Sequence, residues 1–372
     1  MTRLQWDSGV AGFRMIVGVV ATASSAQAQK SPLTLPPIAG VSMVQTLSTP
    51  NSERESVHTV SDANERGLRW TWEAVEVGAN NDTSRSQFRY AELHADIREA
   101  FRLRAYHERD EPEEHPGYTM HALSRAVYRR LSAAGSDSFQ VLSIESPPVG
   151  MLASFAAGRA TPVRWRGTIS VVSPSPAPFP LLLNGQRVEV PALHVRGKFT
   201  VRLKTWSPEF WVLADSAYPL LLKWVGAYDE PTNVLQTTRI DVPGGIRDVE
   251  RVLASSCRAE LPGIYFAFNS AILDAASDRT LTGIAGILVR HPDWSVTLEG
   301  HTDSIGTAAA NRTLSEQRVA AVKSLLVTRH KVEATRLKTV GFGSARPRET
   351  NASIEGRARN RRVELVRDCT RP

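Results

Sequence analysis

The period of the apolar residues changes near residue 262, and the two regions on either side of it must fold differently. Upstream, short stretches alternate apolar and polar residues, which is the period of a strand with one buried face. Downstream, apolar residues recur every three or four positions between short apolar runs, as in helices that alternate with strands. We therefore expect an α+β chain of two domains, an antiparallel β-rich domain over 66–245 and a layered domain of strands and helices over 262–367.

The upstream alternation is clearest at 195–204, where one face carries Val195, Phe199, Val201 and Leu203 and the other carries four cations. Further strands are predicted at 68–73, 164–172, 209–214, 220–225 and 234–242. A helix is predicted at about 120–134 with Thr119 as its N-cap, and 84–104 fits either a helix or a strand. Both faces of the strands carry charge, which favours a soluble domain over one whose strands face lipid.

Residues 1–28 have the pattern of a secretory signal peptide. Arg3 and Arg14 precede the apolar run 15–23, and Ala26-Gln27-Ala28 fits a cleavage site. The run is far shorter than the roughly 20 apolar residues that a membrane-spanning helix needs, so we expect export to the periplasm. A disordered tail on a cytosolic protein is the alternative. Linkers are predicted at 29–65, with one strand at most, and at 246–261.

Charge narrows the class of partner only weakly. The formal net charge of +7 suits nucleic acid, anionic lipid or an anionic polymer, and it equally suits a basic surface without a partner. Because an exported protein rarely meets nucleic acid, we expect none as a partner.

The two cysteines, Cys257 and Cys369, flank the downstream region, and an oxidising compartment would join them as a disulfide. Two buried free thiols are the alternative, and the spacing supports no zinc site.

The downstream region places one carboxylate and one guanidinium near the end of a predicted strand. Strands are expected at 263–268, 294–299, 337–341 and 362–366, and helices at 274–291 and 314–329. Asp303 follows the second strand, and Arg318 would lie in the first turn of the second helix, with Thr313 or Ser315 as N-cap. Together the two charges can hold a zwitterion with an amino group and a carboxylate on one carbon. A simple salt bridge between them is the alternative.

A set of motifs in the downstream region resembles the OmpA-like C-terminal peptidoglycan-binding family. The motifs are Gly300-His-Thr-Asp303, Gly306, Asn311, Leu314-Ser315, Arg318, Gly341-Phe-Gly343, Pro347, Asn351 and the run 356–364. The resemblance covers about 262–367, under a third of the chain, while the upstream region resembles no family that its residues identify. It implies a β/α/β/α/β domain that binds cell-wall peptide stems without cleaving them.

In that family, the residues that match Asp303 and Arg318 hold the amino and carboxylate groups of diaminopimelate. The resemblance also implies that five residues line or support the pocket: Phe268, Asn269, Thr302, Asn311 and Arg362. Two positions depart from the family pattern, since Ser344 replaces a commonly acidic residue and Arg348 a commonly apolar one. We expect a periplasmic, non-enzymatic protein that links its β-rich domain to peptidoglycan. The expected partner of the β-rich domain is an envelope protein or a lipid, and the outer membrane is one candidate.

A wall-tethered enzyme or metal-binding protein, with its chemistry in the β-rich domain, is the alternative. The segment 107–121 gathers acidic residues with His107, His115 and His121, but it lacks a fixed metal-ligand spacing. His301 lies near Asp303 without a nucleophile or a metal cluster to accompany it. A buried pocket with convergent polar groups in the β-rich domain would favour this alternative. We expect no catalytic residue, no metal, no cofactor and no transmembrane helix.

Overall fold

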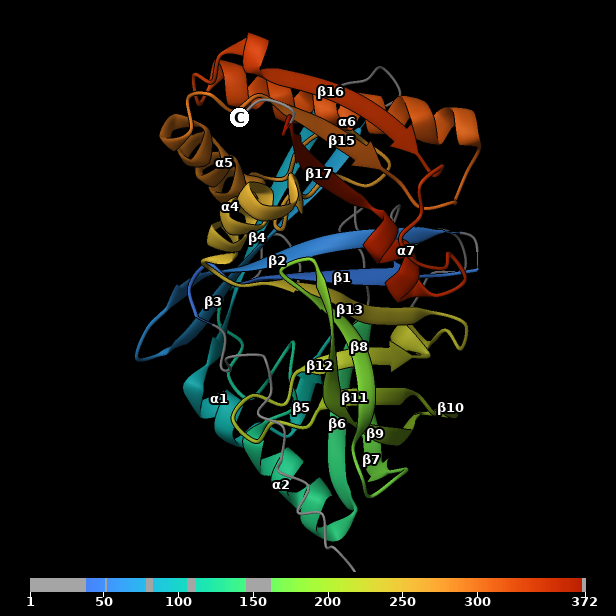
Figure 1. Ribbon diagram of the computed structural model, residues 1–372. Coiled ribbons are helices and arrows are strands. Elements are labelled where there is room, and N and C mark those ends of the chain that lie inside the picture. The colour runs from blue at the N-terminus through green and yellow to red at the C-terminus, as the bar shows by residue number, and fades with distance from the viewer. Residues whose placement is uncertain (1–37, 51, 78–82, 106–111, 145–161, 370–372) are drawn as a thin grey trace, which may run out of the picture. The chain divides into compact units, whose positions relative to one another are not determined.

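The computed structural model describes residues 38–369 apart from 51, 78–82, 106–111 and 145–161 (Figure 1). The predicted signal peptide at 1–28 lies outside the described residues. Within them the chain is β-rich and has two sheets and six α-helices, with a large antiparallel sheet upstream and a mixed sheet with helices downstream, as predicted. None of the described helices combines the length and the apolar composition that crossing a membrane requires.

The larger sheet follows the order β4-β3-β2-β1-β13-β12-β11-β9-β7-β6-β5, with β10 paired to β9 and β8 paired to both β9 and β13. All of these pairings are antiparallel except β5 with β6 and β8 with β13. The strands are β1 (Ser42–Ser48), β2 (Glu53–Ala63), β3 (Gly67–Val77), β4 (Thr83–Leu93), β5 (Arg102–Arg104), β6 (Ser136–Ile144), β7 (Pro162–Val171), β8 (Ala177–Leu183), β9 (Gln186–Val201), β10 (Lys204–Trp206), β11 (Glu209–Leu213), β12 (Leu221–Val225) and β13 (Val234–Asp241).

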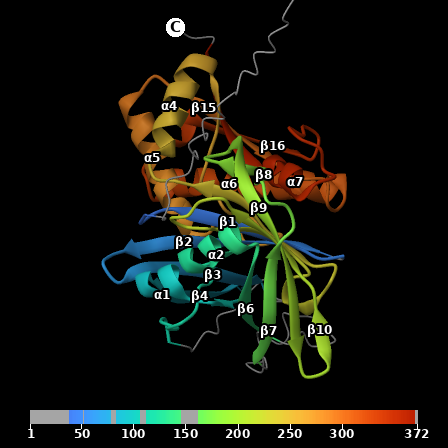
Figure 2. The same cartoon turned by 90° about the horizontal axis from the view of Figure 1, so that it is seen from below.

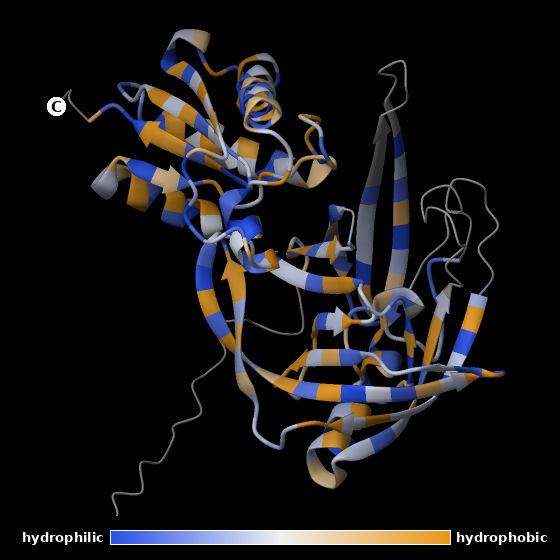
Figure 3. Ribbon diagram, turned by 90° about the vertical axis from the view of Figure 1, so that its right-hand side faces the viewer, coloured by the Kyte–Doolittle hydropathy of each residue, from blue (hydrophilic) through white to orange (hydrophobic). Residues whose placement is uncertain are grey.

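Alternation buries one face of strands such as β7 and β9, and the change of colour from residue to residue is visible in Figure 3. The buried side chains form two clusters, one around Trp70 and Tyr218 and the other around Trp165 and Trp224. The predicted face of β9 is buried at Val195 and Phe199, but Leu203 is fully exposed. The strand ends at Val201, because Arg202 takes a positive φ of 51° and turns the chain toward β10.

Tertiary pairing shortens the helix that the sequence places at 120–134. The helix α2 (Arg125–Ala134) begins five residues later, and its N-cap is Ser124, whose side chain accepts from the Val127 N–H. The residues before α2 form backbone hydrogen bonds with other segments instead of helical ones. The Thr119 N–H donates to the Arg102 carbonyl, and the Leu123 N–H donates to the Pro219 carbonyl. The N-cap prediction of Thr119 is therefore wrong.

The structure decides one open question upstream and corrects one prediction. The undecided span 84–104 contains both types of element, with α1 (His94–Glu99) between β4 and β5. The segment 29–65, expected to be a linker with one strand at most, forms the paired strands β1 and β2. The sequence did not predict both strands, because polar residues such as Ser42, Gln45 and Thr46 are buried in β1. This strand lies inside the sheet, between β2 and β13. A short 3-10 turn, η1 (Ala227–Asp229), precedes β13.

The smaller sheet has the order β14-β17-β15-β16, with β15 parallel to β16 and antiparallel to β17. Its elements are α4 (Gly245–Ser256), β14 (Arg258–Glu260), the 3-10 turn η2 (Ala275–Ser277), α5 (Asp278–Arg290), β15 (Val296–His301), α6 (Ala308–Thr328), the 3-10 turn η3 (Ala334–Arg336), β16 (Leu337–Gly343), α7 (Ile354–Asn360) and β17 (Arg362–Arg367). Figures 1 and 2 show α4, α5 and α6 packed beside this sheet. Their buried stripes, which include Leu253, Leu281, Ile284 and Val322, share one core with Leu298 and Leu365 of the strands.

Three downstream predictions need correction. Residues 263–268 form an isolated bridge, Phe266 with Leu273, rather than a strand, because the side chains of Asp241 and Ser277 take the backbone N–H groups of Gly263 and Tyr265. Helix α6 begins at Ala308 with Thr307 as its N-cap, so neither Thr313 nor Ser315 caps it. The segment 246–261, expected to be a linker, forms most of α4 and all of β14.

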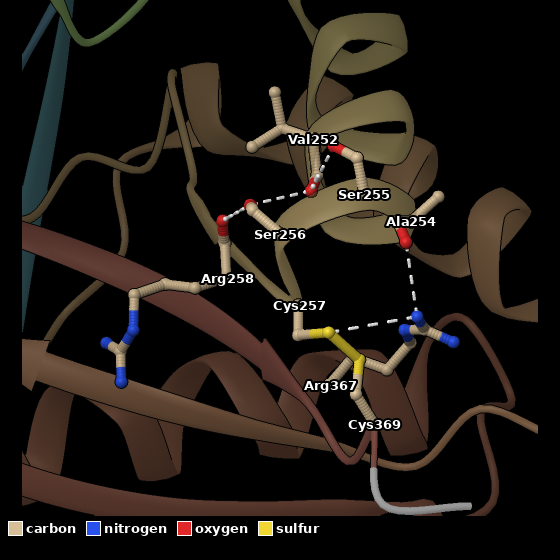
Figure 4. Close-up of a disulfide and its surroundings, with 8 residues drawn as sticks. All are labelled: Val252, Ala254, Ser255, Ser256, Cys257, Arg258, Arg367 and Cys369. Atoms are coloured by element: carbon tan, nitrogen blue, oxygen red, sulfur yellow. Dashed lines mark hydrogen bonds between the residues drawn. A yellow bond between two sulfur atoms is a disulfide. The ribbon is translucent and has the colours of Figure 1, made fainter. Parts of the chain in front are cut away.

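A disulfide joins Cys257 to Cys369, as predicted, with a Cα–Cα distance of 6.1 Å (Figure 4). Cys257 is the C-cap of α4 and adopts the left-handed region, and Cys369 follows β17. Arg367 reinforces the junction by donating to the Ala254 carbonyl at 3.2 Å. The bond therefore ties the helix that opens the downstream region to the strand that closes it.

Candidate functional site

Asp303 follows β15 directly, in the loop that leads to α6. The residue is buried, with 8% of its surface exposed. Its Oδ1 accepts from the Ile305 N–H at 3.0 Å, and its Oδ2 accepts from Arg361 Nη1 at 2.6 Å. The simple Asp303–Arg318 salt bridge considered from the sequence is not among the ion pairs of the described residues, because Arg361 holds this carboxylate instead.

Arg318 lies in the third turn of α6, not in its first turn as the sequence predicted. The helix N-terminus therefore adds nothing to its charge. Its Nε donates to the Ser270 carbonyl at 2.9 Å, and its guanidinium lies 4.9 Å from the centre of the Phe266 ring. Burial lowers the pKa of Arg318 to about 10, against the opposing negative charge of Glu55. Within the described residues, this desolvated cation forms no ion pair with a carboxylate.

Arg361 is bound by three carboxylates that come from distant parts of the chain. Besides Asp303, its guanidinium donates to Glu53 Oε1 at 2.8 Å and to Glu55 Oε1 at 2.6 and 2.9 Å. Burial lowers the pKa of Arg361, but Glu55, Asp303 and Glu53 together raise it above its ordinary value. Glu53 also accepts from Arg357 of α7. The group is a compact network of three carboxylates and two arginines.

The other residues that the resemblance implied have different surroundings. Asn311 donates to the Ile305 carbonyl and Thr302 to the Asp303 carbonyl, so both support the loop that carries Asp303. Phe268 is half exposed beside Arg54, and Asn269 takes a positive φ of 47°. Arg362 donates to Glu364 rather than to Asp303. The structure thus places Thr302 and Asn311 with Asp303, and Arg362 on the neighbouring strand.

A cavity of about 40 Å³ lies between β2 and the downstream region. Its lining includes Arg318, Arg361, Glu55, Val57, Phe266 and His301. Arg362 lines it as well, so three cationic side chains from the downstream region and one carboxylate from β2 border the same space.

Beside this cavity, Glu299, His301 and Glu364 form a buried cluster with the donor atoms of a metal site. Both carboxylates are already bound by arginines, since Arg258 contacts each of them and Arg362 contacts Glu364. Burial, followed by the charge of Arg362, lowers the pKa of His301 to about 4. A divalent cation would have to displace these arginines against their positive charge, so the cluster does not fit a metal ion.

The structure describes only some of the residues that were considered for a metal or enzyme site in the β-rich domain. His107 and its nearest acidic neighbours lie outside the described residues, while Glu113 and Glu114 pair with Arg69 and Arg66. Glu92 accepts four hydrogen bonds, from Trp70 Nε1, the Tyr218 hydroxyl and the N–H groups of Met120 and His121. Because four donors satisfy this buried carboxylate, we assign Glu92 a structural role in the core. Burial lowers the pKa of His121, beside Tyr90, to about 3.

The sequence missed Glu53, Glu55 and Arg361 as residues of the site. Arg361 belongs to the motif run 356–364, so the resemblance already contained it. Glu53, Glu55 and Val57 alternate in β2 with the period of a strand, and that spacing puts the two carboxylates on one face. Their partner lies about 306 positions away along the chain, and no local pattern predicts a contact of that range.

Residues 265–361 match the model of the OmpA family. "Outer membrane porin F" of Pseudomonas aeruginosa is 44% identical over 27% of this chain and 29% of its own length. "Probable lipoprotein YiaD" of Escherichia coli is 43% identical over 28% of this chain and 47% of its own, and "Peptidoglycan-binding protein ArfA" of Mycobacterium tuberculosis is 43% identical over 28% and 31%.

Among solved structures, the cell wall anchor of the T6SS from Pseudomonas aeruginosa is 31% identical, with a TM-score of 0.26. That alignment covers 32% of this chain and 93% of the other. Each curated relative is matched over less than half of its length. The chain therefore spans only part of the length of these relatives.

Proposed function

We propose that this chain, whose residues 265–361 form a domain of the OmpA family, is an exported protein that binds peptidoglycan non-covalently through Asp303 and Arg318. The β-rich upstream region is then the part that the domain holds at the cell wall. One of the relatives is named as a peptidoglycan-binding protein and another as a lipoprotein, which supports a place in the cell envelope.

The observation that carries the proposal is the state of Arg318. A buried guanidinium is costly unless a carboxylate or a comparable partner compensates for its lost hydration. Arg318 is only partly exposed to solvent. Within the described residues its guanidinium has one hydrogen bond, to a carbonyl, and an aromatic face, and burial lowers its pKa to about 10. A binding site for an anion explains why the chain keeps this residue at this place.

The ligand that fits has one carboxylate and one ammonium on the same carbon. Arg318 offers a planar fork to the carboxylate. The carboxylate of Asp303 accepts from the ammonium, provided that Arg361 gives up its hydrogen bond to Oδ2. The free end of diaminopimelate in a peptidoglycan stem peptide has this chemistry. Binding of this kind forms and breaks no covalent bond, so the proposal assigns no catalytic residue.

Replacing Asp303 by asparagine tests the ammonium half of the site. The amide keeps the size and the bond to the Ile305 N–H but loses the charge, so affinity for isolated sacculi is expected to fall roughly tenfold. Asp293→Asn, on an exposed turn, removes the same charge elsewhere and is expected to bind as the wild type does. Co-sedimentation over a range of sacculus concentrations gives both affinities. Equal binding by folded Asp303→Asn and the wild type would contradict the role of Asp303.

A further inference from the structure

The strand β2 brings two carboxylates to the cations of the candidate site. The side chain of Glu53 is 4% exposed and pairs with Arg357 and Arg361, while Glu55 makes two hydrogen bonds to Arg361. Glu55 also borders the cavity that Arg318 lines, and its negative charge acts on the Arg318 guanidinium. Carboxylates of the same chain thus face the cations that a ligand carboxylate would need.

Apolar packing holds this strand against the downstream region. Val44 of β1 and Val57 of β2 form a small buried cluster with Tyr265, whose hydroxyl donates to Asp241 at the end of β13. Arg54 of β2 lies 5.1 Å from the centre of the ring of Phe268. The contact therefore combines a buried apolar cluster with charged residues around it, and it reaches Phe268, which the family resemblance assigns to the pocket.

The hydrogen bonds of Arg361 decide between two arrangements. In a composite site, the ligand carboxylate would share Arg361 with Glu53 and Glu55. All three nitrogens of this guanidinium already donate to Glu53, Glu55 or Asp303. A ligand carboxylate can therefore bind Arg361 only by displacing the carboxylates of β2.

We propose that Glu53 and Glu55 of β2 occupy the carboxylate side of the peptidoglycan site, so that the stem peptide and this strand compete for Arg318 and Arg361. This inference rests on the proposed function, because it assigns a competitor to the same site. The form described here is the closed, low-affinity form. Binding requires the downstream region to separate from β2, and the measured affinity is the intrinsic affinity reduced by the fraction of open molecules.

Removing the competing charges should therefore raise affinity. Glu53→Gln, Glu55→Gln and the double variant keep the size of the side chains but weaken the attraction to Arg361. We expect the double variant to bind sacculi roughly three- to thirtyfold more tightly than the wild type, with smaller gains for the single variants. Glu65→Gln, on the exposed turn after β2, is the matched control and should leave affinity unchanged.

Carboxyl labelling of the unaltered wild-type protein provides a second readout that needs no variant. Carbodiimide-driven labelling followed by mass spectrometry should modify Glu53 slowly in the free protein and at least several times faster with saturating diaminopimelate stem peptide. Glu92, buried in the upstream core, should stay protected in both states, and Glu65 should be labelled in both.

The outcomes separate the two proposals. If neither the wild type nor any variant binds sacculi, the proposed function fails. If the wild type binds and Asp303→Asn binds poorly, but the double Glu→Gln variant binds equally or more weakly, the competition is refuted and the glutamates are part of a composite site. Glu53 protection that is unchanged at saturation would refute the competition as well.

Discussion

Replacing Arg318 by alanine is expected to lower affinity for diaminopimelate stem peptide by about ten- to a hundredfold without unfolding the protein. The guanidinium would supply charge-assisted hydrogen bonds of roughly 1.5–3 kcal/mol to the ligand carboxylate. Each 1.4 kcal/mol corresponds to about a factor of ten in affinity. Arg318→Lys should also bind poorly, because an ammonium cannot make the planar two-point contact.

The fold should tolerate the loss of Arg318. Its present partners are a carbonyl and an aromatic ring, and removing a desolvated cation without an ion pair relieves a cost of burial. Arg312→Ala is the matched control, since Arg312 lies on the same helix, is exposed and pairs only with Glu316 among the described residues. Titration calorimetry beside thermal melts by circular dichroism gives affinity and stability together. A folded Arg318→Ala protein with wild-type affinity would rule out this role.

Loss of the disulfide is expected to cause the largest change in stability. The bond between Cys257 and Cys369 closes a loop with a sequence separation of 112. In the chain-entropy model, a cross-link over a loop of this size stabilises by about 4–5 kcal/mol, which is an upper value because residual structure in the unfolded chain reduces it. Cys257→Ser/Cys369→Ser should therefore unfold at clearly lower urea concentration than the oxidised wild type.

Reductant provides the control for this prediction. Adding dithiothreitol should bring the wild type to the unfolding midpoint of the double serine variant and should leave the variant itself unchanged. Sacculus binding should persist in both at low temperature, because the bond lies at the ends of α4 and β17 and not at Asp303 or Arg318. An unaltered midpoint after complete reduction would show that the bond adds nothing to stability.

The downstream fold could be predicted well because its signals are local. The apolar stripe of α5, with Leu281, Ile284 and Leu288, is buried as its spacing predicted. Boundaries were less predictable, since both Thr307 and Thr313 can cap a helix. The side chain of Thr307 accepts from the Ala310 N–H, and the three alanines that follow it favour the earlier start of α6.

Contacts between distant segments could not be predicted from the same patterns. The run 263–268 has the composition of a strand, but side chains of Asp241 and Ser277 bind its backbone, and no short-range signal announces them. The same holds for Glu53 and Glu55 at Arg361. The resemblance named Asp303 and Arg318 as site residues, whereas Glu53 and Glu55 belong to a strand that the family motifs do not include.

The most direct test of two-ended recognition is competition between sacculi and free peptides of graded chemistry. A stem peptide that ends in diaminopimelate carries both the ammonium and the carboxylate. The same peptide with lysine at that position lacks the carboxylate of the side-chain end, and one with 2-aminopimelic acid, the pimelate peptide, lacks the ammonium of that end. We expect only the diaminopimelate peptide to displace the wild-type protein from sacculi at moderate concentration, with both others at least tenfold weaker. Equal displacement by the lysine peptide would contradict a carboxylate held by Arg318, and equal displacement by the pimelate peptide would contradict an ammonium held by Asp303.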